Sequence, residues 1–469
     1  MNERNFEGNW WVPEAPSEKV PGQLLFDNEE GLRLRLSGVL ATSDLFSVHT
    51  ASVPIIFGEV SGSSTGSNVT LFASLPSHTE LSTVARQELK SRLAVLGSHV
   101  GSEEQLRITS AEIGFTQLPP WLNVGGFTLD VHSDIVKAGE PVAYDVHYRP
   151  VRLPTVRIPP GELSFILRSM PPLFATRTYP LQEWTGINID LATELPFWQF
   201  KVGTLWYLQN FFTFATDHRN TIDSLYVKMY ESGETVEVLF QDLIEHEPLA
   251  HPIEMLFTYA VIADNLQKVL EQWFGLYAML GPVLNALFST IYRQVTAVDT
   301  RFLNIIQAAE SYDRRMNPPG DLSAHRLRVN RTWLSAPPEY RDWVRGKLWN
   351  AHELFLSARL KRVFDRLGHD FLRRLFNSRD EQKTVLWRMG VWRNALTHVT
   401  STVEENAEHL VWLHIATNQL LCALKANLLL DIGFSPGDLP ERFKHNQTYN
   451  FFAHHQKGSN KRGPTTLTS

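Results

Sequence analysis

Residues 380–398 read DEQKTVLWRMGVWRNALTH, a stretch with the pattern of one amphipathic helix. Its apolar residues recur at intervals of three and four, which predicts a single buried stripe: Val385, Leu386, Met389, Trp392 and Leu396. Thr402-Val403-Glu404-Glu405 then has the form of a capping box that begins a new helix. The apolar body of that second helix, from Leu410 to Leu430, indicates a central core helix. We therefore expect His398 near the end of one helix, just before the next.

Outward from this stretch, the pattern of the first half of the chain is different. Residues 1 to about 245 show short alternating apolar and polar runs, separated by Gly, Ser and Pro, which is typical of β-strands. In one such run, Leu32, Leu34 and Leu36 would share a face of a strand. Residues 61–67 are rich in Gly and Ser and predict a hairpin tip. No strand–helix–strand alternation is visible, so a sandwich or barrel is favoured over a parallel sheet.

After residue 250 the apolar period becomes helical and continues to about Phe434. Breaks are predicted at residues 281–282, 318–320 and 337–338, each of which contains proline. The fold class expected is therefore α+β and multidomain. It comprises a β-rich domain (1–245), a helical domain (250–435) and a turn-rich segment (436–469) that ends in a disordered tail.

One apolar segment is long enough to cross a membrane. Gln272 to Tyr292 is uncharged over roughly the length of a membrane span. Polar residues occur within it, however, and Gly281-Pro282 interrupts its middle, so two buried helices meeting at that break are expected instead. The first 30 residues hold several charges and no apolar run, so no signal peptide is predicted.

Charge and cysteine content narrow the class of protein. Cys422 is the only cysteine, which rules out internal disulfides and Cys-based zinc sites and favours a reducing, cytoplasmic location. The net charge is −6, yet residues 301–400 carry 19 Lys and Arg against 10 Asp and Glu, a balance of +9. Such a segment is what a nucleic-acid surface needs. The alternative is that these arginines only solvate the outer faces of helices.

The candidate chemistry lies at the end of the first helix. Arg393 is a permanently charged phosphate binder, and His398 can carry a proton near neutral pH. This pair is sufficient to cut RNA without a metal, because the 2′-hydroxyl is a built-in nucleophile. A similar spacing occurs in three other places, which are Arg92/His99, Arg345/His352 and Arg362/His369. Only Arg393 is followed directly by a polar residue, Asn394.

The spacing also raises a geometric problem. Five residues along an ideal helix leave Arg393 and His398 about 140° apart around its axis. Either the helix frays before His398, or the working site combines side chains from two copies of the chain. The alternative is that both residues have only structural roles: Arg393 pairs with Glu404 or Glu405, and His398 caps a helix. At a helix C-terminus, the macrodipole would favour the protonated form of His398.

The sequence contains no motif that predicts a bound cofactor or a metal ion. The chain lacks a phosphate-binding glycine loop, an HExxH helix and a Gly-x-Ser-x-Gly elbow, and His454-His455 lies in a polar stretch. The pair Trp10-Trp11 is interpreted as core. Exposure of that pair in a groove would instead favour a third function, carbohydrate binding.

The Arg-polar-x-x-x-His arrangement between two helices resembles the motif of HEPN ribonucleases. Further segments resemble ApeA-type proteins of bacterial anti-phage abortive infection, which join a β-rich N-terminal domain to a C-terminal HEPN domain. The resemblance runs from Gly8 to about Leu430. The segments that carry it occur in order and are residues 8–14, 20–22, 31–40, 96–99, 118–121, 272–274, 301–303 and 309–312.

The resemblance implies a metal-independent endoribonuclease that works as a homodimer with facing motifs. Arg393 would bind and polarise the phosphate, His398 would act as general acid or base, and Asn394 would orient the RNA or its motif partners. Glu310 and Arg314 are second candidates, with a surface ion network as their alternative role. The substrate would be cellular RNA such as tRNA. The N-terminal domain would respond to a phage-derived activator, and no membrane would be involved. A non-catalytic RNA-binding or scaffolding protein is the alternative function.

Overall fold

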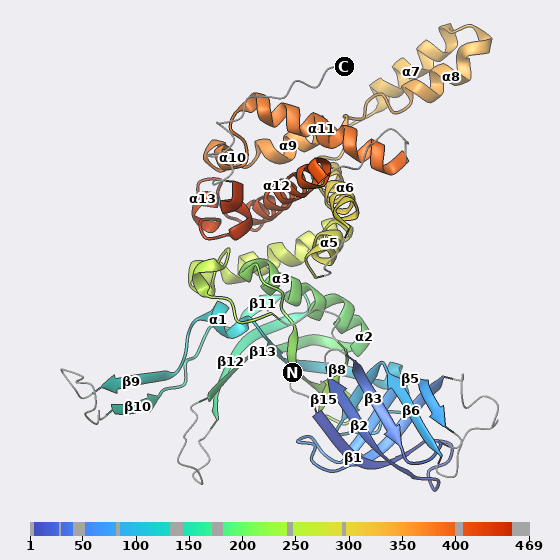
Figure 1. Cartoon of the computed structure of the whole chain (residues 1–469), viewed down its shortest axis with the longest axis vertical. Helices are drawn as coiled ribbons and strands as arrows, with labels where there is room; N and C mark the ends of the chain where they lie inside the picture. The colour runs from blue at the N-terminus through green and yellow to red at the C-terminus, as the bar shows by residue number, and fades with distance from the viewer. Residues whose placement is uncertain are drawn as a thin grey trace. The chain divides into compact units, whose positions relative to one another are not determined.

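The computed structural model describes residues 4–27, 30–40, 52–80, 85–131, 144–170, 182–241, 247–292, 297–398 and 407–452. The chain divides into two compact units, Met1–Gln267 and Lys268–Ser469. The first is built on strands and the second on helices (Figure 1). The expected α+β class is confirmed.

Six antiparallel strands of the N-terminal unit close into a barrel. Closure follows because β6 pairs with β3 on one side and with β5 on the other, so the order β5-β4-β1-β2-β3-β6 returns to its start. A closed barrel leaves no strand edge among these six. The strands are β1 (Arg4–Trp11), β2 (Val20–Asp27), β3 (Gly31–Leu36), β4 (Val53–Val60), β5 (Asn68–Glu80) and β6 (Arg86–Ser91).

The barrel interior is filled as the alternating pattern predicts. Leu32, Leu34 and Leu36 of β3 are buried among the core residues, while Arg35 is exposed on the opposite face. Trp10 is fully buried in the same core. Its ring lies so close to Gly58 that a side chain there would come within 2.4 Å of it. Since Trp11 is also buried, the carbohydrate-binding hypothesis loses the exposed aromatic pair on which it depended.

Strand β5 also connects the barrel to an open sheet. Its first part pairs with β7, its second part with β6, and the change falls around Ala73, whose φ of 51° is unusual for a non-glycine residue. The sheet continues in the order β7-β15-β14-β8-β13-β12-β11. These strands are β7 (Leu93–Leu96), β8 (Arg107–Phe115), β11 (Val156–Ile158), β12 (Gly161–Met170), β13 (Gln182–Pro196), β14 (Ile222–Met229) and β15 (Thr235–Leu239).

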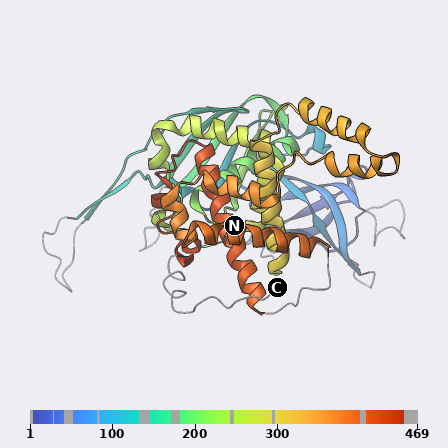
Figure 2. The same cartoon turned by 90° about the horizontal axis from the view of Figure 1, so that it is seen from above.

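A separate hairpin, β9 (Phe127–Val131) with β10 (Tyr144–Tyr148), extends away from this sheet (Figures 1 and 2). Short helices pack on the sheet, and Trp121 of α1 lies fully buried against Phe211 and Phe212 of α3. These helices are α1 (Leu118–Leu122), α2 (Phe197–Phe200), α3 (Trp206–Thr216) and α4 (Tyr259–Ile262).

The C-terminal unit is all-helical, and the predicted core helix lies at its centre. Helix α12 (Ala407–Asp431) packs against α6 (Val298–Met316) and α9 (Leu356–Asp365), and α11 (Arg379–His398) packs against both of these. Breaks separate α6 from α7 and α7 from α8 at the predicted prolines. The other helices are α5 (Leu266–Tyr292), α7 (Ser323–Ser335), α8 (Arg341–Leu348), α10 (His369–Leu375) and α13 (Leu439–Arg442).

The uncharged segment 272–292 belongs to α5, which is hydrogen-bonded as one helix with Pro282 inside it. Nevertheless, the rings of Trp273 and Phe288 lie 6.0 Å apart. Fifteen residues of straight helix would separate them by about 22 Å along the axis, so the chain bends sharply between them. Pro282, which is exposed, accounts for this bend. The expected break is present as a bend within one helix, rather than as two separate helices.

The stretch Tyr259–Tyr292 is long and apolar enough to cross a membrane, but half of its most apolar window is buried inside the protein. Its buried positions recur at three and four residues, for example Leu266, Val269, Leu270 and Trp273. That periodicity is typical of a helix with one face in a protein core.

Candidate active site on helix α11

The motif arginine is held by two neighbours. Arg393 lies in the last two turns of α11, where its Nη2 donates to Oε2 of Glu310 on α6 at 3.4 Å. Its Nη1 donates to Oδ1 of Asn394 at 3.1 Å. The Arg393 side chain is 30% exposed, so one part of the guanidinium is oriented by protein and another part remains open to a ligand.

The helix continues through the motif. The α11 backbone is helical as far as His398, and the Oγ1 of Thr397 donates to the carbonyl of Arg393 at 2.6 Å, as in a regular turn. The side chain of His398 lies outside the described part of the structure. Because the helix does not fray before His398, about 140° still separates it from Arg393 around the axis.

The buried stripe of α11 is confirmed at its centre. Leu386, Met389 and Trp392 are buried, while Val385 and Leu396 are partly buried. The proposed capping box and the carboxylates Glu404 and Glu405 lie outside the described residues. Among the described residues, the carboxylate that pairs with Arg393 is that of Glu310.

Glu310 belongs to a chain of ion pairs that links three helices. Its Oε1 accepts from Arg314 at 3.0 Å, and Arg314 also reaches Glu353 at 3.0 Å. Glu353 in turn lies 3.6 Å from Arg359 of α9. The ion network predicted as the alternative role of Glu310 and Arg314 is present, and through Glu310 it also reaches Arg393.

The buried end of this network is Asp313, whose side chain is 1% exposed. It accepts hydrogen bonds from Arg359 at 3.3 Å and from Arg362 at 2.6 Å. A buried carboxylate is stable only when such partners are present. The network therefore fixes α6 against α9 and, through Glu310, orients Arg393. Sequence reasoning missed Glu353 and Arg359, because nothing local marks them as partners of α6.

The three other Arg–His spacings have different structural roles. Arg92 pairs with Glu103, and His99 contacts the carbonyl of Gly58. Arg362 is the partner of Asp313. Arg345 stacks over two tryptophans, Trp333 and Trp349.

Aromatic and basic residues gather beside the motif. Trp392, directly before Arg393, packs against His409 with ring centroids 4.7 Å apart, and against Trp412 at 6.3 Å. Arg388 lies over the Trp412 ring at 4.5 Å. Because Trp392 is buried, this cluster packs the end of α11 against α12. The sequence offered no local signal for this cluster, because its members come from α11 and α12.

One further histidine of α12 is electrostatically distinct. Partial desolvation and the charge of Arg301 lower the pKa of His414 below its ordinary value. Although His414 is an exposed residue overall, this shift favours the neutral ring at pH 7. Among the described residues, no group of three or more His, Cys, Asp or Glu is placed to hold a metal ion.

Two protein-family models match the chain. The one described as ApeA N-terminal domain 1 matches residues 5–273, which is more than half of the sequence. The one described as Apea-like HEPN matches residues 303–438, a range that contains α9, α11, α12 and most of α6. No curated protein and no solved structure matches the chain.

Proposed function

Because the chain belongs to the ApeA family and carries a HEPN domain, we propose that it is an anti-phage abortive-infection protein that cleaves cellular RNA. The observation that carries this proposal is the geometry of Arg393. Its guanidinium is aligned by Glu310 and Asn394 on a helix that ends at His398. A phosphate-binding group and a proton carrier thus occur in the last two turns of one helix.

The proposed reaction is attack of the RNA 2′-hydroxyl on the adjacent phosphorus. A base takes the 2′-hydroxyl proton, the new P–O bond forms, and the bond to the 5′-oxygen breaks as an acid protonates that oxygen. Arg393 stabilises the negative charge that grows on the phosphate oxygens. The products are a 2′,3′-cyclic phosphate and a 5′-hydroxyl. No step in this sequence requires a metal ion.

Two imidazoles are the simplest source of the acid and the base. One motif supplies one imidazole, and about 140° separates it from its own arginine. We therefore place two copies of the chain around a two-fold axis, so that Arg393 of each copy faces His398 of the other. In this arrangement Glu310 is a positioning residue, since it orients Arg393 without contacting the reacting atoms.

The N-terminal domain is assigned the regulatory role. It supplies most of the acidic residues of the chain, since residues 1–245 hold 29 of the 50 Asp and Glu against 17 Lys and Arg, a balance of −12 (17 − 29). We propose that it restrains the nuclease until a phage component, for which a protein is the simplest candidate, binds to it in the cytoplasm. Structured RNA such as tRNA is the proposed substrate.

The test compares wild type with His398→Ala in bacterial cells, with and without phage. Sequencing of RNA ends should reveal new cyclic-phosphate ends only with wild type after infection. Purified protein supplied with extract of infected cells, as the source of the activator, should give the same ends in excess EDTA. Full phage protection by a well-expressed His398→Ala variant would instead support the non-catalytic RNA-binding or scaffolding function. A requirement for added Mg²⁺ would contradict the proposed chemistry.

A further inference from the structure

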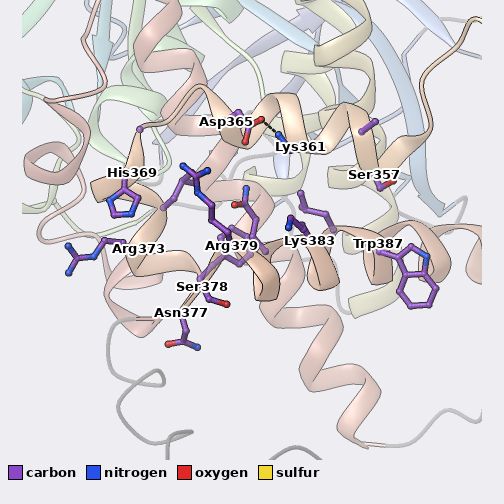
Figure 3. A pocket seen from close by; sticks show the side chains of 16 residues that line it. Ser357, Lys361, Asp365, His369, Arg373, Asn377, Ser378, Arg379, Lys383 and Trp387 are labelled. Carbon is purple, nitrogen blue, oxygen red and sulfur yellow. Dashed lines mark hydrogen bonds and ion pairs between the residues drawn. The ribbon is translucent and has the colours of Figure 1, made fainter. Parts of the chain in front are cut away.

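A cavity of about 690 Å³ lies at the other end of α11, between its first turns and helices α9 and α10 (Figure 3). This volume is within the range of small-molecule sites. Its apolar surface comes from residues such as Leu372, Phe376 and Leu386. The cavity is therefore large enough for an organic ligand, not only for an ion.

The charged lining is strongly basic. Four cations line the cavity against a single carboxylate, Asp365, for a balance of +3 (4 − 1). Lys361 is paired with Asp365, and Lys383 is paired with Asp380 at 3.0 Å. Within the described part of the chain, Arg373 and Arg379 have no ion-pair partner. Two such guanidiniums at one cavity are suited to a phosphate, because each planar guanidinium can donate two parallel hydrogen bonds to a pair of phosphate oxygens.

A buried amide provides an independent sign of a ligand. Gln382 lines the cavity and is only 9% exposed, and its Nε2 has no hydrogen-bond partner within the described residues. Leaving a buried donor unpaired is costly. A ligand oxygen in the cavity would supply the missing acceptor.

An exposed aromatic ring completes the site. Trp387 is 64% exposed and lies at one end of the cavity, while His369 and Arg373 lie at the other end (Figure 3). Positions 379, 383 and 387 recur every four residues and so follow one face of α11. Position 387 lies about 6 Å along the helix axis from position 383 and about 12 Å from position 379. Aromatic rings next to cations bind nucleotides by stacking on the base and pairing with the phosphate.

We propose that this cavity binds a nucleotide, with its phosphate at Arg373 and Arg379 and its base stacked on Trp387. The nucleotide is either free or one unit of an RNA strand. Arg379 precedes Arg393 by 14 residues, or about 21 Å of helix, so this site is separate from the cleavage motif. Nucleotide binding here does not depend on the proposed RNA cleavage.

The test is calorimetric titration of the full-length His398→Ala protein, which leaves any RNA uncut. The probes are the four ribonucleoside 5′-monophosphates, a short single-stranded oligoadenylate and inorganic phosphate. Changing Arg373 and Arg379 together to Gln should weaken nucleotide binding at least about tenfold. Trp387→Ala should weaken it by about 5- to 150-fold without changing phosphate binding, and Trp387→Phe should restore most of it. Arg331→Gln, an exposed site on α7 outside the cavity, is the matched control.

Each outcome has a defined meaning. Binding of monophosphates supports a site for free nucleotides, and binding of the oligoadenylate alone supports a site on the RNA path. The proposal is overturned if neither binds, if inorganic phosphate binds as tightly as the nucleotides, or if the Arg373/Arg379 variant binds as wild type does. Because the readout is binding by an uncleaving protein, failure of the nuclease proposal would leave this result interpretable. The side chains of Arg331, Arg373, Arg379 and Trp387 are exposed, so these variants should fold, and circular dichroism checks this.

Discussion

The two ends of helix α11 both carry arginines, but their surroundings differ. Near the C-terminal end, Arg393 is held by Glu310 and Asn394. Near the N-terminal end, Arg379 lines an open cavity and has no ion-pair partner among the described residues. A paired guanidinium is already oriented, which suits a group that must act on one bond. An unpaired guanidinium can take its anionic partner from a ligand, which suits a group that binds. Their partners, rather than their charge, distinguish the two ends.

The largest expected effect is at the C-terminal end. His398→Ala should lower the rate of RNA cleavage by about 10²–10⁴-fold, the usual contribution of a general acid or base. Single-turnover assays measure this rate, and circular dichroism checks the fold. Nucleotide binding at the N-terminal end should be unchanged. Cleavage at the wild-type rate would refute the assignment of His398.

Arg393→Lys should be the next most severe change, on the order of 10²-fold in rate. The charge is kept, but an ammonium cannot make the two parallel hydrogen bonds of a guanidinium. Measuring kcat and KM separately would show whether the loss lies mainly in kcat, as we expect. Equal activity would mean that Arg393 supplies only bulk charge, and the contrast between the two ends would disappear.

If the active site combines side chains from two copies, inactive chains should inhibit active ones by forming mixed dimers with an incomplete site. With wild type mixed into a nine-to-one excess of His398→Ala after subunit exchange, activity per wild-type chain should fall about tenfold. The same excess of an unrelated protein is the control. Light scattering under the assay conditions should show at least a dimer. A monomer that cleaves RNA would place the second imidazole in the same chain, and His409 and His414 of α12 would then be the first candidates.

The smallest effect is expected at the positioning residue. Glu310→Gln removes the charge that aligns Arg393 and should lower kcat by about fivefold, with little change in KM. Glu353→Gln is the matched control, since Glu353 pairs with Arg314 and Arg359 and does not contact Arg393. If both variants lose the same activity, the network contributes only stability.

Much of the fold follows from periods that are local in the sequence. The alternation in residues 32–36 predicts which faces of β3 are buried and exposed, because successive strand residues point to opposite sides. The three- and four-residue spacing in 380–398 predicts α11 almost to its ends, and proline positions predict the breaks around α7. The alternation does not decide between a sandwich and a closed barrel, because that choice depends on which strands pair, and strand pairing joins segments far apart in the chain.

The candidate site was predictable only in part. Arg393, Asn394 and His398 are adjacent enough to be recognised as a motif, and Glu310 was a second candidate. The pairing of Glu310 with Arg393 spans 83 residues and depends on how α6 packs against α11. The basic cavity was not foreseen, because Arg373, Gln382 and Trp387 come from two helices and carry no shared spacing.

What the sequence by itself determined is therefore the period of each segment, the breaks between segments and a motif within one helix. All of these depend on contacts within a few residues. What only the tertiary structure decided is which carboxylate orients Arg393 and which arginines remain available to a ligand. Those outcomes depend on packing between helices, where a shift of one turn exchanges one partner for another.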